Sequence, residues 1–149
     1  MNRLAFLAVL ALVACDGIPK DQAGTLERIR AEGSYRVGLA SGPVGAAPVV
    51  PEALLFRLSE RTGARARIES GSLERLLARL ERGELDLVVG EVGKTSPWSA
   101  EVTFVKPPLA VTQSRPAPEL QLTAIARNGE NGWIALLHRE ARALGSGGR

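Results

Sequence analysis

Polar side chains that could bind a ligand stand at the ends of three stretches predicted as β-strands. Serines follow two of these stretches, and a glutamate and a lysine follow the third, where open α/β sheets commonly bind their ligands. Such hydroxyl, carboxylate and ammonium groups hold small polar molecules through hydrogen bonds and ion pairs. Serine is equally at home in a turn or at a helix start, so a structural role stays open for each serine. The residues are Ser41, Ser70, Ser72, Glu91 and Lys94.

Trp98 lies in a proline-containing loop beyond the third stretch. An indole there could stack on a ligand, but loop tryptophans often serve as packing anchors, and both interpretations stay open. Trp133 instead falls on the apolar stripe of a predicted helix and is assigned to the core.

Groups suited to covalent or metal chemistry are few. The chain has one Cys and one His, which excludes a Cys/His zinc cage and an internal disulfide. His138 stands near Glu140 on a predicted helix, with no nucleophile in a recognisable elbow, and is interpreted as a surface histidine. No phosphate-binding glycine loop, paired-carboxylate spacing or metal motif occurs. We therefore expect no enzyme, no metal and no cofactor.

The composition predicts one globular domain that does not bind nucleic acid. A length of 149 residues suits a single domain. The net charge of +3 comes from basic residues scattered among acidic ones, whereas nucleic-acid binders concentrate positive charge on one face. Aromatic residues are only 4% of the chain, which argues against a surface on which bases or sugars stack.

The amino terminus has the pattern of an export signal. A charged Arg3 precedes an unbroken apolar run from Leu4 to Ala14, which is too short for a membrane span but typical of a signal peptide. Cys15 follows directly, and residues 12–15 resemble the bacterial lipobox, whose cysteine carries acyl chains such as palmitate. A plain signal peptide with an incidental thiol is the alternative. We expect a signal over 1–14, a tether over 15–24, and a lipid anchor facing the periplasm. In diderm lipoproteins Asp16 would resemble a signal for staying at the inner membrane.

Hydrophobic periodicity predicts an α/β layer in the first part of the mature chain. The clearest helix has Leu73, Leu76, Leu77 and Leu80 on one face, and Gly83 ends it. Its polar side, expected to face water, carries Glu74, Arg75, Arg79 and Glu81. Alternating strands and helices at short spacing favour a parallel sheet. The predicted strands are Ser34–Ala40, Arg65–Glu69, which a turn over Ser70–Ser72 follows, and Leu85–Val89. The other predicted helices are Leu26–Glu32, capped by Thr25, and Pro51–Thr62.

The pattern loosens after Gly90. Short extended pieces are predicted at Val102–Val105 and Leu109–Thr112, a linker at Gln113–Glu119 and a strand at Leu122–Ala126. A last helix, capped by Asn131, is predicted to reach Leu144, with a loose tail over 145–149.

Four segments, taken in order, carry a resemblance. They are Thr25–Gly33 with Tyr35–Gly38, Leu80–Gly90, Thr95–Pro107, and Ala124–Ala126 with Gly129–Trp133. Together they resemble the extracellular solute-binding proteins of bacterial ABC importers, of the polar amino-acid type. The resemblance spans about Thr25 to Leu144. It implies a periplasmic-binding-protein-like α/β lobe and adds Thr95 to the candidate ligand residues.

Two departures from that family matter. Its members usually carry, three residues after the threonine, an Arg that grips the ligand's α-carboxylate, and here Trp98 stands at that position. The second lobe of the family would be inserted between Thr112 and Gln121, where this chain has only about ten residues. The resemblance therefore implies lobe one alone, a short and mainly parallel sheet flanked by helices over 25–144.

Two functions remain open from the sequence. The first is capture of a small polar solute of the amino-acid type, with an ABC permease or a second copy completing the cleft. The second is an anchored interaction or sensory module that keeps the scaffold and has lost its ligand. An enzyme is the least favoured class.

Overall fold

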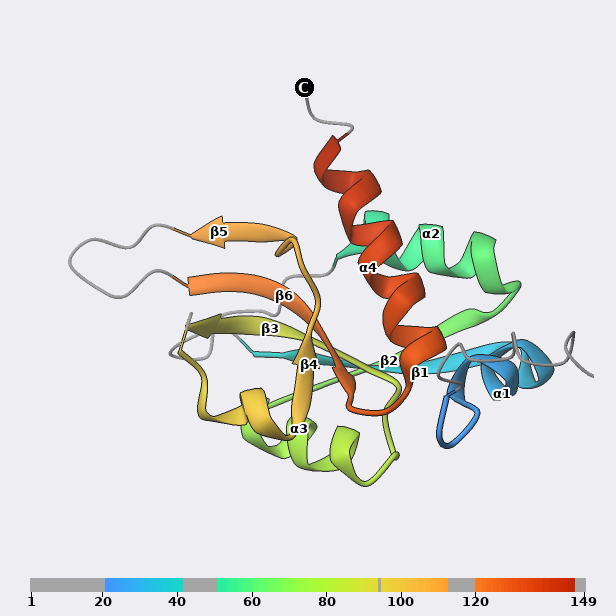
Figure 1. The fold of residues 1–149 in the computed structure, drawn as a ribbon, viewed down its shortest axis with the longest axis horizontal. Helices are drawn as coiled ribbons and strands as arrows, with labels where there is room; N and C mark the ends of the chain where they lie inside the picture. Colours follow the sequence, from blue (N-terminus) through green and yellow to red (C-terminus); the bar gives the residue numbers. More distant parts are fainter. Residues whose placement is uncertain (1–20, 42–50, 94, 113–119, 147–149) are drawn as a thin grey trace, which may run out of the picture.

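The computed structural model describes residues 21–41, 51–93, 95–112 and 120–146, and these form one sheet with helices on both faces (Figure 1). The strand order is β2-β1-β3-β6-β4, with β5 also pairing with β6. The strands are β1 (Ser34–Ala40), β2 (Arg65–Gly71), β3 (Leu87–Gly93), β4 (Val102–Phe104), β5 (Ala110–Thr112) and β6 (Leu120–Arg127).

The expected parallel layer is the half of the sheet formed by β2, β1 and β3, in which both pairings are parallel. The strand β6 runs antiparallel to β3, β4 and β5 and joins the later elements to that layer. The α/β lobe expected from the sequence is confirmed, and its sheet is mixed, with the parallel pairings among β2, β1 and β3.

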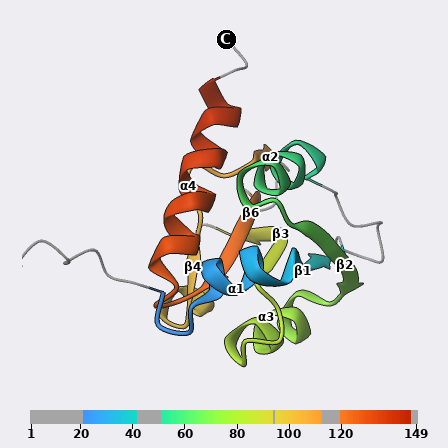
Figure 2. The same cartoon turned by 90° about the vertical axis from the view of Figure 1, so that its right-hand side faces the viewer.

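Helices cover the two faces of the sheet unequally (Figures 1 and 2). On one face pack α1 (Thr25–Glu32), α2 (Glu52–Thr62) and α4 (Asn131–Ser146), and on the other pack α3 (Leu73–Glu81) and the 3-10 helix η2 (Pro97–Ala100).

Strand alternation divides the core into two apolar layers. In β1, Val37 and Leu39 point toward α2 and α4, whereas Ala40 faces α3. The predicted face of α3 is buried: Leu76, Leu77 and Leu80 are at most 1% exposed, and Leu73 packs at the edge of the same layer. Gly38 permits this close approach, since a Cβ there would lie 2.9 Å from a methyl group of Leu76.

The glycines predicted to end α1 and α2 do end these helices, whereas the residues predicted to start them are placed differently. Gly33 and Gly63 end α1 and α2 with φ of 64° and 70°, the left-handed conformation that glycine adopts without strain. Gly24, not Thr25, is the N-cap of α1, and Pro51 precedes α2 instead of forming its first helical residue.

Several expected boundaries move. The strand β2 continues through Ser70 and Gly71, which were expected in a turn, because the register with β1 extends to Ala40 and Gly71. The strand β3 begins at Leu87 rather than at 85 and runs on to Gly93. The strand β6 begins at Leu120 and ends at Arg127, wider at both ends than expected. The helix α4 reaches Ser146, so the first two residues of the expected tail are helical.

Within the described ranges, no helix combines the length and the apolarity needed to cross a bilayer.

Candidate functional site

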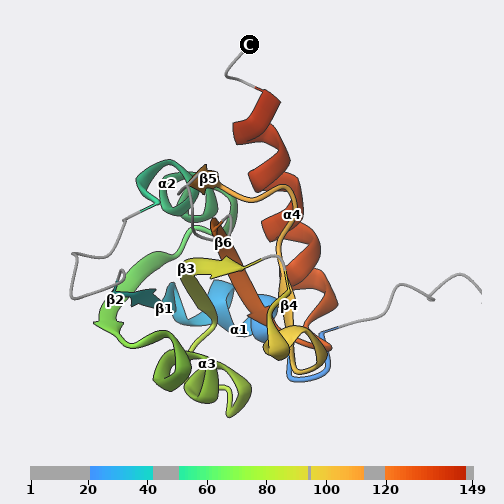
Figure 3. The same ribbon diagram turned by 90° about the vertical axis from the view of Figure 1, so that its left-hand side faces the viewer.

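A cleft of about 370 Å³ opens at the carboxyl ends of β1 and β3. This end of the sheet faces the viewer in Figure 3. Strand ends at this position are where α/β sheets commonly bind ligands. The cleft is lined by Ala40, Ser41, Ser72, Leu73, Glu74, Glu91 and Leu120.

Backbone pairing and a helix start position the hydroxyl groups of the cleft. The amide of Ser41 donates to the carbonyl of Gly71 at 2.9 Å, which holds the end of β1 against β2. Ser72 is the N-cap of α3 in an extended conformation, and its side chain makes no capping hydrogen bond to the helix. The first amides of a helix lack intrahelical acceptors and carry the positive end of the helix dipole. The cleft therefore combines hydroxyls and backbone donors with the carboxylates of Glu74 and Glu91.

The structure brings together three of the residues expected to bind a ligand, Ser41, Ser72 and Glu91. Ser70 is exposed on the edge strand β2, opposite Leu39, and does not line the cleft. Thr95 is exposed and also lies outside the lining.

Trp98 acts as a packing side chain. It is half-buried in η2 and lies against the apolar layer under α3, and it is not part of the cleft lining. Its amide donates to the hydroxyl of Ser96 at 3.4 Å, which caps the short helix. Lys94 and Cys15 lie outside the described residues.

Sequence reasoning missed Glu74, which was expected only to face water on the polar side of α3. It is exposed, but it stands in the first turn of the helix and so reaches the cleft mouth. Its position two residues after a serine at a helix start was the available signal.

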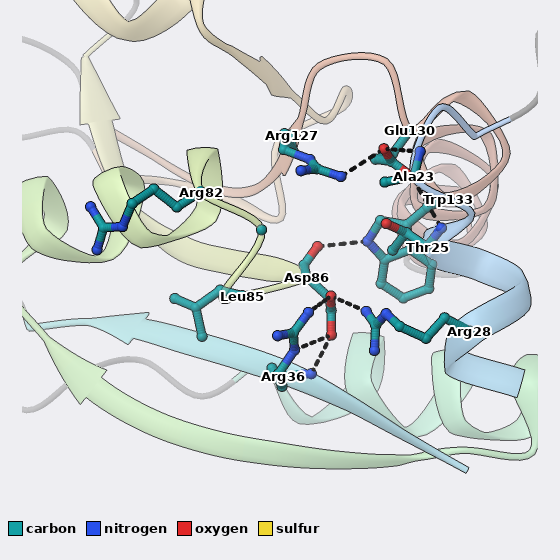
Figure 4. Close-up of a pocket in the computed structure, with 11 residues that line it drawn as sticks. Ala23, Thr25, Arg28, Arg36, Arg82, Leu85, Asp86, Arg127, Glu130 and Trp133 are labelled. Carbon is teal, nitrogen blue, oxygen red and sulfur yellow. Dashed lines mark hydrogen bonds and ion pairs between the residues drawn. The ribbon is translucent and has the colours of Figure 1, made fainter. Parts of the chain in front are cut away.

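A second pocket, of about 170 Å³, lies at the opposite end of the sheet (Figure 4). Its central group is Asp86, whose side chain is only 2% exposed and accepts from Arg28 and Arg36. The contacts to Arg36 are 3.1 Å from Nε, 2.8 Å from its terminal nitrogen and 2.8 Å from its backbone amide. This hydrogen bonding to Asp86 raises the pKa of Arg36 further above its ordinary value.

Two other buried carboxylates serve the fold. Glu140 on α4 is 1% exposed and pairs with Arg57 at 2.8 Å and with Arg61 and Arg139 at 3.2 Å. Glu130 is 2% exposed and pairs with Arg127 at 2.8 Å. Burial acts to raise the pKa of Glu130, but hydrogen bonds from Thr25, Ala23 and Arg127 outweigh it and leave that pKa lowered.

A reciprocal pair of caps fastens the start of the described chain to α4. Glu130 accepts from the amides of Ala23 and Thr25, at 3.0 and 3.1 Å. In return, Asp21 accepts from the amides of Trp133 at 3.1 Å, of Leu26 at 2.8 Å, and of Gly132. This clasp brings residues 21–24, which were expected within the tether, into the folded domain. The turn before α1 lies at the right of Figure 1, whereas the carboxyl ends of β1 and β3, where the cleft opens, lie at the left.

Comparison with known proteins assigns the fold. No protein-family model and no curated protein matches the sequence. The arginine-bound domain 1 of TmArgBP from T. maritima matches with a TM-score of 0.63 and 18% identity, over 78% of this chain and 98% of that one. The arginine-bound ABC-transporter substrate-binding protein AbpA of Streptococcus pneumoniae gives 0.63 and 11%, spanning 82% and 93%.

The VFT2 domain of BvgS from Bordetella pertussis is also similar, with a TM-score of 0.60 and 12% identity, spanning 85% of this chain and 94% of that one. At sequence identities this low, the structural likeness establishes the fold alone. The chain has the fold of domain 1, a single lobe, of the amino-acid-binding proteins that serve ABC transporters.

Proposed function

We propose that this protein captures a small polar solute in the cleft at the carboxyl ends of β1 and β3. The observation that carries the proposal is the convergence of Ser41, Ser72 and Glu91 in one cleft, at the end of the sheet where this fold type binds ligands. The role is one of binding, with no reaction catalysed, and the similar solved structures include binding proteins that hold arginine.

The polarity of the cleft favours a solute that carries a positive charge. Its charged lining groups are the carboxylates of Glu74 and Glu91, and it has no arginine or lysine among the described lining residues. The indole of Trp98 packs under α3 where the resembling family has a carboxylate-gripping Arg. An amine or guanidinium group would pair with the exposed Glu74 at the cleft mouth, beside Glu91, through a charge-assisted hydrogen bond.

The chain would act at the outer face of the cell membrane, anchored through an acylated Cys15. The clasp of Asp21 to α4 supports this arrangement, because it fixes the chain at the end of the sheet opposite the cleft. Asp21 lies six positions after Cys15, and an extended chain of that length reaches roughly 20 Å. The cleft would then face away from the bilayer, toward arriving solutes.

A single lobe gives the solute only one wall, and a permease of an ABC importer or a second copy of the chain would supply the other. A closed two-wall site with a Kd of about 1 μM has roughly −8 kcal/mol of binding free energy. Half of that free energy corresponds to a Kd of about 1 mM. Weak binding by the monomer is therefore the expected property of this arrangement.

A titration followed by NMR tests the proposal. Arginine should shift the amides of Ser41, Leu73 and Glu91 in a verified monomer, with a Kd near 1 mM by the free-energy argument. Glutamate should bind more weakly, because the cleft carboxylates repel it. Glu91→Gln should weaken arginine binding, whereas Glu60→Gln, on the exposed side of α2, should leave it unchanged.

Two outcomes would contradict this reasoning. A low-micromolar Kd for the monomer would mean that the chain already contains two walls. If saturating arginine causes no shifts of the cleft amides, arginine does not bind there. That result would favour the second candidate, an anchored interaction or sensory module. The packing of Trp98 at the position of the family's carboxylate-gripping Arg is the observation that favours that candidate.

A further inference from the structure

We propose that the pocket at the amino ends of β1 and β3 binds a small oxyanion of the phosphate class through Arg28, Arg36 and Arg127 (Figure 4). This site lies at the end of the sheet opposite the cleft and does not depend on solute binding there.

Three guanidinium groups from separate elements converge on this pocket, and two buried carboxylates hold them in place. Asp86 pairs with Arg28 and Arg36 below Trp133 in the view of Figure 4, and Glu130 pairs with Arg127 above it. The carboxylate side chains are 2% exposed, whereas the arginine side chains are 27–39% exposed. The carboxylates therefore hold one side of each guanidinium group in place, and the other side stays accessible to a ligand.

The arginines keep most of their hydrogen-bonding capacity. A guanidinium has five N–H donors. Among the described residues, side-chain contacts engage two donors of Arg28, two of Arg36 and one of Arg127. The planar fork of arginine matches the oxygen spacing of phosphate, and charge-assisted bonds of this type are strong. Guanidinium groups that are already held in place and still have unused N–H donors are what the binding of an oxyanion requires.

The charge balance inside the pocket also favours an anion. The charged lining residues are four arginines, Arg28, Arg36, Arg82 and Arg127, and two carboxylates, Asp86 and Glu130. Arg82 pairs with Glu84 at 2.6 Å, so the three remaining arginines against the two carboxylates leave a positive excess. Glu32 also contacts Arg28, but its side chain is 54% exposed at the rim, where water screens its charge. The pocket volume of about 170 Å³ equals that of several water molecules and suits a tetrahedral oxyanion.

Gly83 makes room for one of the three arginines. It has a φ of 73°, and a Cβ at this position would lie 2.9 Å from a terminal nitrogen of Arg127. A side chain at this turn after α3 would require the end of the Arg127 side chain to shift. The turn is therefore shaped to admit Arg127.

Trp133 forms one wall and provides a reporter. Its side chain is fully buried, and its Nε1 donates to the backbone carbonyl of Asp86 at 2.7 Å. An anion between the arginines would lie beside this indole and change its fluorescence. Trp98→Phe removes the other tryptophan and isolates the signal.

Two sources present the same chemistry, free inorganic phosphate and the phosphate of a lipid headgroup. The clasp of Asp21 adjoins the pocket through Glu130 and Trp133. An acylated Cys15 would therefore hold this end of the domain near the bilayer surface, where anionic headgroups are concentrated.

The test titrates inorganic phosphate into the processed full-length protein carrying Trp98→Phe, with sodium chloride keeping the ionic strength constant. Trp133 fluorescence should saturate in the millimolar range. Arg127→Gln and Arg28→Gln should each weaken binding about tenfold, as expected for loss of a charge-assisted pair. Arg127→Lys should restore only part of the affinity, because lysine keeps the charge but not the fork. Arg142→Gln, which removes the same charge from the far half of α4, should have no effect.

Vesicles then separate the two sources. Competition with phosphate by phosphatidylcholine vesicles containing roughly a third phosphatidylglycerol, but not by pure phosphatidylcholine vesicles, identifies the headgroup. Saturation by phosphate without such competition identifies the free anion, and the site stands in either case. Absence of saturation in a folded protein would overturn the proposal. Equal weakening by Arg142→Gln and Arg127→Gln would also overturn it, because the effect would then be one of diffuse charge.

Discussion

Replacing Asp21 with alanine tests whether the reciprocal clasp holds the amino-terminal segment on the domain. The single carboxylate of Asp21 accepts hydrogen bonds from the amide of Leu26 in α1 and from the amides of Gly132 and Trp133 in α4. It therefore caps the starts of two helices at once. Loss of one N-cap costs about 0.5–2 kcal/mol. Because two helix starts lose their acceptor together, Asp21→Ala should lower the free energy of unfolding by about 1–3 kcal/mol.

Urea titration of the processed protein measures this free energy of unfolding, and hydrogen exchange shows which part of the domain loses stability. Exchange at the amides of Leu26 and Trp133 should accelerate more than exchange at Leu77, which lies on the other face of the sheet. Glu60→Ala is the matched control, since its exposed carboxylate lies on α2, and it should cost at most about 0.5 kcal/mol. A loss below about 0.5 kcal/mol for Asp21→Ala would show that the clasp is not formed in solution.

Three further outcomes are expected. Leu77→Ala should cost about 2–5 kcal/mol in a urea titration, whereas Arg75→Ala on the exposed side of α3 should cost at most about 0.5 kcal/mol. The pKa of Glu130 is lowered in the folded protein, so the stability that its carboxylate gives the fold is complete above about pH 4.5 and is lost as the pH falls through that lowered pKa. Glu130→Gln should therefore be less stable than the unchanged protein at neutral pH and should lose less stability on acidification, as measured by thermal melts at several pH values. Cys15→Ala should abolish metabolic labelling with a fatty acid, and equal labelling of both proteins would refute the anchor.

The elements of the parallel layer could be predicted because local patterns dictate them. The four leucines of α3 recur at helical spacing, and the structure buries that face as expected. Gly33 and Gly63 mark helix ends through a backbone conformation that needs no tertiary partner. Where a partner strand decides the boundary, the prediction was wrong: Ser70 and Gly71 have turn chemistry, but pairing with β1 keeps them extended.

The buried carboxylates could not be predicted, because partners distant in sequence define each of them. Asp86 interrupts an apolar run, and nothing local reveals that Arg28, 58 residues earlier, neutralises it. The role of Arg79 was missed for the same reason: it pairs with Glu69 and Glu84, although its helix position marks it as solvent-facing. Its removal would break these contacts, and Arg75 is therefore the better surface control.

The described sheet is continuous without a second lobe, because β6 pairs on both sides. The resemblance to two-lobe solute-binding proteins implies that a second lobe would be inserted between the counterparts of β5 and β6. Here Thr112 of β5 lies opposite Leu120 of β6, so the two strands pair antiparallel across the seven residues 113–119. The strand β6 also pairs with β3 over six residues and with β4 over three. At the point where the resemblance would insert a second lobe, the chain thus has a short connection, with no gap in the described sheet. Under the proposed function, the second wall of the cleft is what this short connection leaves out, and so its effect must be measured on binding affinity and not on the stability of the fold.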